Sequence, residues 1–586
     1  MISTRLRRHW AALIAALLMG LLYASFHFFI QKEVTALGRE YEPAPAEGNL
    51  DEGYYALRAA RAYAGEGRIG DINLVEYKGT PSFLPLANPH IFSLLAAALG
   101  SLDRAFIASD FLFSGIIFFL IYLIALEVGI PRGGATVFSF FFMIAPKFAL
   151  FPSGGALPFF EPARALFFSR FDYPSLTYIF YALVLYLAAR LAARKEEHVS
   201  VLLGIAAGFT FYTYLYDWVY LFGALILLVL FFSLQGERER ALFFARAILI
   251  GLFVSIPYWI NFVELVSLPS YTDLAERIGL EHGRFFRVAV VWPSYVRHLG
   301  LLLLLALSGH LRKEKNVLTF FAALLLPIFV LLNLQVITGF VPHPDHWQRT
   351  WLLPLGLAAA LVLYEAYRAY RSAFSPLARP LLRTLGVCVI TSSALYGIWV
   401  QRTLAHEQAA AFTRENSHAA AYEWLRANTP KDSVVGTLSS RTNDEIILHT
   451  NNKIYTPNGL HTVAPTAEIW ERIRHAARLF DLSTEEFRAL TQKQTLYFFT
   501  DLYHRDSSFN AYFRRTYREI PKEILEKESW LYESEKLNSY MPTYELDYLL
   551  IDDRTQLLEG KDEALSLWGK LVYTSDELSI YKSILE

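Results

Sequence analysis

The chain has 586 residues, of which 54% are hydrophobic and 19% are charged, and its mean hydropathy is +0.29. A soluble globular protein carries roughly 25% charged residues, so this composition argues against a soluble protein. Its hydrophobicity also excludes a disordered chain. The 54 Lys and Arg against 55 Asp and Glu leave no basic excess, which excludes the nucleic-acid-binding class. The single cysteine, Cys388, excludes an internal disulfide framework, a zinc ribbon and an iron–sulfur cluster.

Apolar runs of about 20 residues, the length that crosses a bilayer as a helix, recur through the first 400 residues. The runs are 10–30, 106–127, 135–151, 174–191, 199–215, 218–234, 241–262, 292–309, 317–338, 351–367 and 384–400. The first run follows Arg7 and Arg8, as a signal peptide would, but no small-residue cleavage site follows it, so we interpret it as a retained helix. We therefore predict a polytopic α-helical membrane protein with about eleven transmembrane helices.

Lys and Arg gather in every second connection between these runs, as the positive-inside rule expects of cytoplasmic loops. The basic segments are 5–8, 132, 190–195, 238–240, 312–315 and 368–383, and the long or acidic ones are 31–105, 152–173, 263–291 and 339–350. This alternation predicts a cytoplasmic N-terminus. It also predicts a transmembrane module of residues 1–400, with a long first external loop at 31–105, and an extracytoplasmic domain of residues 401–586. An outer domain without disulfides favours a bacterial or archaeal plasma (inner) membrane.

Residues 401–586 are more polar and have the pattern of a small α/β domain. We predict helices at 422–428, at 443–449 and within 466–530, strands at 433–438 and 546–551, and a hairpin over 570–581. No motif in this part of the sequence is catalytic in type. The whole chain also lacks an Asp-x-Asp triplet, a Walker-type loop and a His-Glu-x-x-His motif.

Asp51 stands at the start of an amphipathic segment in the first external loop. The apolar residues of this segment recur at helical spacing and are Tyr55, Ala59, Ala62 and Tyr63. We predict a helix lying on the membrane surface, with Arg58 and Arg61 off its apolar face. Asp51 has two interpretations, an N-cap of this helix or a general base that deprotonates an acceptor hydroxyl. The two roles conflict in part, because amide bonds to a carboxylate lower its basicity.

Charged residues also gather in the other connections predicted to face outward. They are Glu161, Arg164, Arg170 and Asp172 in the second external loop, Asp217 in a short turn, and Arg297 and His298 near the outer end of the eighth helix. Any one of these charges has a simpler interpretation as a solvated group at the membrane interface. Together, carboxylates with arginines between them indicate a site for a phosphorylated, hydroxylated substrate.

The segment 342–351, Pro-His-Pro-Asp-His-Trp-Gln-Arg-Thr-Trp, precedes the tenth predicted helix. His343, Asp345 and His346 are a conceivable metal ligand set, although adjacent residues of a Pro-constrained loop rarely converge on one ion. Arg349 has two interpretations. Its guanidinium matches phosphate oxygens and would bind an anion, or its side chain reaches to the interface by snorkelling.

The combination of these segments resembles the GT-C superfamily of polytopic glycosyltransferases, which includes protein mannosyltransferases, aminoarabinose transferases and oligosaccharyltransferase catalytic subunits. The resemblance rests on a cytoplasmic N-terminus, one helix, and a long outer loop in which Asp51 and Glu52 open a helix. The segment 349–354, Arg-Thr-Trp-Leu-Leu-Pro, is similar to the start of a late helix in that superfamily. The segments 422–435 and 571–582 resemble the opening and the closing hairpin of its outer domain.

The resemblance implies inverting transfer of a sugar from a polyprenyl-phosphate carrier, on the outer side of the membrane, to a lipid, glycan or protein acceptor. By position, Asp51 matches the catalytic base, Glu52 is its neighbour, and Arg349 would hold the carrier's phosphate. Glu161 and Asp172 lie where some families bind a divalent metal ion, and the missing Asp-x-Asp form leaves the cofactor open. Two alternatives are a transporter or lipid flippase, for which no repeat symmetry is visible, and a non-catalytic membrane scaffold.

Overall fold

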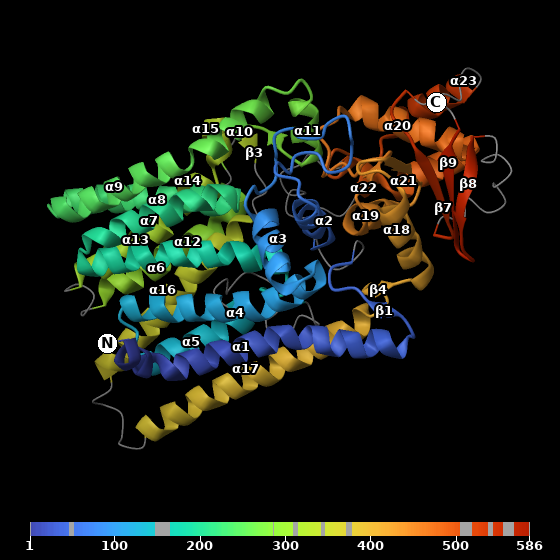
Figure 1. Ribbon diagram of the computed structural model, residues 1–586. Helices are drawn as coiled ribbons and strands as arrows, with labels where there is room; N and C mark the ends of the chain where they lie inside the picture. The colour runs from blue at the N-terminus through green and yellow to red at the C-terminus, as the bar shows by residue number, and fades with distance from the viewer. Residues whose placement is uncertain are drawn as a thin grey trace. The chain divides into compact units, whose positions relative to one another are not determined.

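The computed structural model describes residues 2–45, 52–146, 165–284, 286, 288–308, 314–341, 346–370, 378–503, 519–536, 543–554 and 568–584 (Figure 1). The chain forms two compact units. Unit 1 comprises Met1–Glu33, Arg104–Trp259 and His282–Ala409, and unit 2 comprises Val34–Asp103, Ile260–Glu281 and Ala410–Glu586. The residues of the predicted first external loop therefore group with the C-terminal part of the chain. The expected boundary at residue 400 stays a prediction.

Unit 1 is helical. Its longer helices are α1 (Ile2–Ala36), α4 (Leu102–Glu127), α5 (Arg132–Ile144), α6 (Thr177–Arg194), α7 (Glu197–Phe209), α8 (Leu215–Leu234), α9 (Arg238–Val254), α12 (Val288–Leu307), α13 (Lys315–Leu325), α16 (His346–Tyr370) and α17 (Ala378–Gln408). The helix α10 (Ile256–Val266) begins in unit 1, and its residues from Ile260 on belong to unit 2. Between them lie the short elements η2 (Phe171–Leu176), η3 (Thr210–Tyr212), α14 (Ile328–Leu331), α15 (Leu334–Thr338) and the strand pair β2 (Glu281–His282) with β3 (Phe340–Val341).

Six helices in the described residues are long and apolar enough to cross a membrane, and a seventh span results if one bent pair counts as one. The six are Arg8–Ala36, Leu102–Glu127, Phe171–Arg194, Leu215–Leu234, His346–Tyr370 and Thr384–Gln408, and the bent pair is Arg238–Val254 with Ile256–Val266. Each of the eleven predicted runs overlaps a helix, but four of these helices are shorter than a full span: Arg132–Ile144, Glu197–Tyr212, Trp292–Leu307 and Lys315–Leu331. Eleven crossings therefore stay a prediction.

Small residues allow α7 and α9 to pack closely. A methyl group on Gly208 would stand 2.7 Å from the carbonyl oxygen of Gly251 and 2.6 Å from Cβ of Val254. One on Gly204 would stand 2.7 Å from the carbonyl oxygen of Ala247. Gly204 and Gly208 are four residues apart and so share one helix face, which is the small-xxx-small pattern of close helix crossings in membranes.

Adding a single methyl group to this crossing should therefore destabilise unit 1. We expect Gly208→Ala to lower the free energy of unfolding by about 1–3 kcal/mol, because overpacking forces backbone shifts. Thermal unfolding of the detergent-solubilised protein measures this. Gly223→Ala is the matched control, since its new methyl group would meet only Cβ of Pro327, at 3.9 Å. Equal unfolding midpoints for the two variants would contradict the assigned crossing.

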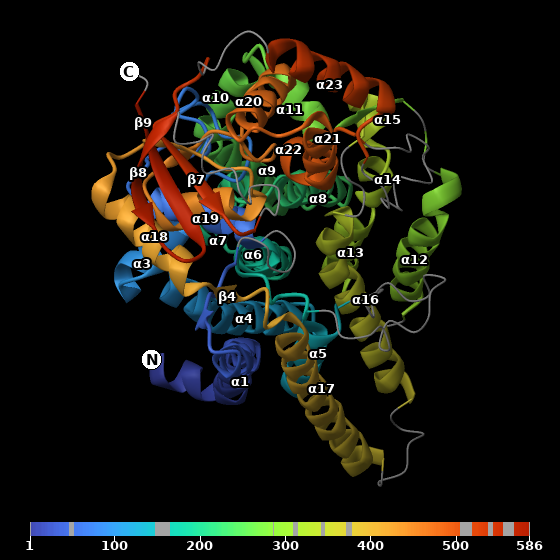
Figure 2. The ribbon, with the colours of Figure 1, turned by 90° about the vertical axis from the view of Figure 1, so that its right-hand side faces the viewer.

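Unit 2 is built around a five-stranded mixed sheet of order β6-β5-β7-β9-β8 (Figure 2). The strands are β5 (Val434–Gly436), β6 (Lys453–Ile454), β7 (Tyr548–Asp552), β8 (Gly569–Thr574) and β9 (Leu578–Ser583). β5 pairs in parallel with β6 and β7, while β9 pairs antiparallel with β7 and β8. The strands predicted at 433–438 and 546–551 and the hairpin over 570–581 are all present, and β6 was not predicted.

Helices cover both faces of this sheet, which explains why every residue of β7 is buried. Tyr548 and Leu550 belong to one apolar cluster with α18 (Asn416–Asn428) and α19 (Ser440–His449). Leu549 and Ile551 belong to another with α20 (Thr466–Leu479), α21 (Thr484–Lys493), α22 (Thr495–Phe499) and α23 (Lys522–Lys536). Alternate side chains of a strand point to opposite faces. Because both faces are covered, the sequence of β7 is a continuous apolar run from Tyr548 to Ile551.

The first loop folds into this same unit. It contains β1 (Glu40–Tyr41), which pairs with β4 (Thr413–Arg414), then α2 (Glu52–Tyr63) and α3 (Asn88–Leu99); α11 (Tyr271–Arg277) joins them from the 260–281 segment. The polar face of α2 is not exposed, because Arg58 and Arg61 are 1% and 0% exposed, and the position of this helix on the membrane surface stays a prediction. Arg58 donates to the carbonyl oxygen of Ile69 at 2.6 Å, and Arg61 donates to that of Asn452. These backbone acceptors offset part of the cost of burying the two guanidinium groups, and most of the helix, residues 56–62, is buried.

Candidate functional site

A buried ion pair between Arg349 and Asp217 is the main polar feature inside unit 1. Arg349 lies in the first turns of α16 and is 3% exposed, and Asp217 lies in the first turn of α8 and is fully buried. Nη2 of Arg349 donates to Oδ2 of Asp217, and Nε donates to Oδ1 at 3.3 Å. Nη2 also donates to Oγ1 of Thr177 at 2.7 Å. This two-pronged contact fixes the plane of the guanidinium.

Aromatic rings enclose the guanidinium of Arg349. Its Cζ lies 4.1 Å from the ring centre of Tyr173 and 4.2 Å from that of Tyr214, both within the range of cation–π attraction. The hydroxyl of Tyr214 donates to that of Tyr173 at 2.7 Å and lies 2.6 Å from Nδ1 of His346. The rings exclude water from the arginine and so strengthen its electrostatic interactions.

The segments at the starts of three helices, α6, α8 and α16, bring these groups together. Tyr173 lies in η2, which runs directly into α6 at Thr177. Tyr214 is extended and precedes α8, so Asp217 falls in the first turn of that helix, where a carboxylate is favoured by the helix dipole. His346 opens α16, and Arg349 follows almost one turn later. The site is therefore formed by the starts of three predicted spans.

One donor of Arg349 is not used within the described residues. Nη1 is buried and has no hydrogen-bond partner there, whereas Nε and Nη2 are engaged. A buried donor without a partner costs roughly 1–3 kcal/mol, and charged residues inside membrane segments commonly mark substrate sites. The arrangement is suited to an anion that would accept from Nη1. The alternative of snorkelling is wrong, because it would leave the guanidinium exposed.

The predicted site residues divide into three groups. Asp217, His346 and Arg349 lie together. Asp51, Glu161 and His343 lie outside the described residues, so their roles stay predictions, as do the metal ligand sets that include Glu161 or His343. The other four are also described. Glu52 begins α2 in unit 2, and Arg297 donates to Oγ of Ser294 at 3.1 Å. Asp172 is buried in η2, and Cζ of Arg170 lies 5.4 Å from the ring centre of Tyr173, the ring that also contacts Arg349.

The sequence analysis did not select Thr177, Tyr173 or Tyr214 for the site. Tyr173 follows the selected Asp172, and Tyr214 lies three residues before the selected Asp217. Their nearness to these acidic residues is a sequence signal that could have identified them. Thr177 shows no sequence signal, because a threonine at the start of an apolar helix is common. Its contact with Arg349 spans 172 residues of sequence.

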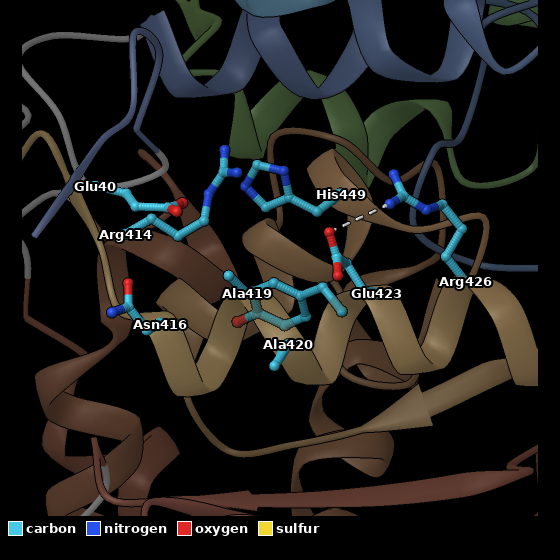
Figure 3. Close-up of a pocket in the computed structure, with 9 residues that line it drawn as sticks. Glu40, Arg414, Asn416, Ala419, Ala420, Glu423, Arg426 and His449 are labelled. Carbon is cyan, nitrogen blue, oxygen red and sulfur yellow. Dashed lines mark ion pairs between the residues drawn. The ribbon is translucent and has the colours of Figure 1, made fainter.

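Unit 2 contains a polar pocket with a volume of about 270 Å³ (Figure 3). Its lining residues are Glu40, Arg414, Asn416, Ala419, Ala420, Tyr422, Glu423, Arg426 and His449. The small side chains of Ala419 and Ala420 leave room along one face of α18. Figure 3 shows Arg414 and His449 at one end and the Glu423–Arg426 ion pair, 3.9 Å apart, at the other. Charges of both signs suit a small polar ligand and specify no further class.

No family model and no curated protein matches the chain. Among solved structures, the chain is similar to ArnT from Cupriavidus metallidurans bound to undecaprenyl phosphate, with 12% identity, a TM-score of 0.46, and coverage of 97% of this chain and 98% of that one. It is also similar to the Archaeoglobus fulgidus oligosaccharyltransferase tethered with an acceptor peptide, with 12% identity, a TM-score of 0.44, and coverage of 98% and 74%. Both are GT-C glycosyltransferases, the superfamily that the sequence resembles.

The buried pair predicts strong coupling between its two members. We expect Asp217→Asn alone to lower the free energy of unfolding by about 3–5 kcal/mol, because the charge of Arg349 stays buried without its partner. The double variant Asp217→Asn with Arg349→Met should lose less than this single variant. Thermal unfolding in one detergent measures both.

Glu197→Gln is the matched control, because Glu197 pairs with Arg246 at an exposed position and such a pair contributes at most about 1 kcal/mol. A double variant less stable than Asp217→Asn would contradict the assigned pair.

Proposed function

We propose that the protein is a membrane glycosyltransferase that transfers a sugar, with inversion, from a polyprenyl-phosphate carrier to an acceptor on the outer side of the plasma (inner) membrane. In this proposal about eleven helices cross the membrane, the N-terminus is cytoplasmic, and residues 401–586 form an extracytoplasmic α/β domain. The acceptor is a lipid, a glycan or a protein.

The Arg349 site carries the proposal. Its arginine is buried, held in one orientation by Asp217 and Thr177, and has Nη1 without a partner in the described residues. The surrounding helix starts belong to predicted membrane spans, so an anion bound here would lie where a lipid-linked phosphate can reach. Planar N–H groups match phosphate oxygens. The resemblance of segment 349–354 to the late helix of the GT-C superfamily supports the same role.

The chemistry assigns one role to each predicted residue. The acceptor hydroxyl oxygen attacks the anomeric carbon as the bond from that carbon to the phosphate oxygen breaks, and the electron pair leaves with the phosphate. Arg349 stabilises the negative charge that develops there. Asp51 takes the hydroxyl proton, with Glu52 beside it. Glu161 and Asp172 would contact substrate or contribute to a divalent metal site if the reaction uses one. The remaining substrate contacts are assigned to Arg170, Asp217, Arg297, His343 and His346.

Retention of a lipid-linked phosphate tests the substrate class. We expect native mass spectrometry of the gently solubilised protein to show a bound polyprenyl-phosphate or its glycosylated form. The double variant Asp217→Asn with Arg349→Met should lose it at least tenfold, since it removes the phosphate contact and leaves no buried charge unpaired. Arg246→Ala is the control, because Arg246 pairs with Glu197 at an exposed position, and it should retain the lipid. Only bulk phospholipid, identical in all samples, would contradict the proposal.

Transfer activity tests the base. With the retained carrier as donor, Asp51→Asn should reduce the rate of sugar transfer by at least 100-fold, because an amide cannot accept the proton. Asp103→Asn, a substitution of the same kind in the same part of the chain, should leave the rate unchanged. Full transfer by Asp51→Asn would exclude this residue as the base. Movement of the intact carrier across the membrane without sugar transfer would indicate a flippase instead.

A further inference from the structure

Three potential metal ligands that have no assigned role in sugar transfer lie together in unit 2. Glu415 precedes α18, His418 lies in the first turn of that helix, and Asp553 directly follows β7. One ligand atom of each lies within 4.8 Å of the others. Two ligand atoms on one tetrahedral Zn²⁺ ion are about 3.5 Å apart, so side-chain rotations that shorten these distances would bring all three to one ion.

The imidazole of His418 is fully buried between carboxylates. Nδ1 lies 3.2 Å from Oε2 of Glu415, and Nε2 lies 3.8 Å from Oδ2 of Asp552. Nε2 has no hydrogen-bond partner in the part of the chain that the structure describes, and neither has Oδ1 of Asp552, whose side chain is also fully buried. Buried polar atoms are normally paired. Two unpaired atoms that face the same cluster indicate that it holds a further group.

The charges of the cluster indicate that this group is a cation. Asp552 has no Lys or Arg within 4 Å among the described residues and accepts a hydrogen bond only from Thr442. Glu415 has two basic partners, Arg554 at 3.0 Å and Arg39 at 3.8 Å, and Arg554 also contacts Glu445 at 2.7 Å. Asp552 is therefore the buried carboxylate of the cluster without a basic partner, and a buried charge without compensation is costly.

We propose that Glu415, His418 and Asp553 bind one divalent transition-metal ion, preferentially Zn²⁺, and that Asp552 orients the imidazole. A mixture of imidazole and carboxylate ligands suits Zn²⁺ better than Ca²⁺, which takes oxygen ligands. A carboxylate beside the second ring nitrogen is the usual support of a metal-bound histidine. The ion joins the start of α18 to the end of β7, and so it stabilises unit 2.

The test is Zn²⁺ binding by the full-length, detergent-solubilised protein after chelator treatment, with isothermal titration and thermal unfolding as readouts. The wild type should bind one equivalent, and its unfolding midpoint should rise with Zn²⁺ concentration. Asp553→Asn should weaken binding at least tenfold; because Asp553 is exposed, this variant retains the fold. His418→Gln should do the same.

His449→Gln is the matched control, because His449 contacts Glu42 at 2.8 Å and lies outside the cluster. It should bind Zn²⁺ as the wild type does. Two outcomes would overturn the proposal. Equal binding by the wild type, Asp553→Asn and His418→Gln would show that the protein's other histidines bind the ion adventitiously. No binding by the wild type would show that the cluster holds no divalent ion.

Discussion

The buried contact between Arg349 and Asp217 joins the starts of two helices in the interior of the helical unit. Neither charge can remain in an apolar interior alone, so the starts of α8 and α16 have to meet. Thr177 then requires the start of α6 beside them. Aromatic rings rather than aliphatic side chains fill the remaining space, because they favour a cation at their faces. The same arrangement that pairs the two charges leaves one arginine donor for a substrate.

Unit 2 depends on a different set of buried polar contacts, which join the first loop to the sheet. Oδ2 of Asp71 accepts from the backbone N–H of Val463 at 3.0 Å, and Nζ of Lys453 donates to the carbonyl oxygen of Ile72 at 3.2 Å. Burial lowers the pKa of Lys453 to about 8, so this lysine is held in place at an electrostatic cost. These contacts hold the chain that follows Asp51 and Glu52 against the sheet, and the pairing of β1 with β4 holds the chain that precedes them.

Much of the fold followed from patterns that are local in the chain. The apolar runs correspond to helices, and the strands at 434–436, 548–552, 569–574 and 578–583 lie where alternation and turn residues predicted them. β6 was missed because Lys453–Ile454 is only two residues long and carries a charged residue. The burial of Arg58 and Arg61 was not predicted, because both arginines donate to carbonyl groups that the sequence cannot locate.

The sequence by itself determined which segments are helical, which residues bear the charges, and that Asp217, His346 and Arg349 are candidates for one substrate site, because hydropathy and charge are properties of single residues and of their near neighbours. Only the tertiary structure decided which charges pair. Asp217 and Arg349 lie 132 positions apart in the sequence. His418 lies in α18, before the first strand of the five-stranded sheet, whereas Asp552 is the last residue of β7. Such contacts depend on how helices and strands pack, and that packing is set by the shapes of buried side chains acting together rather than by a pattern within any one segment.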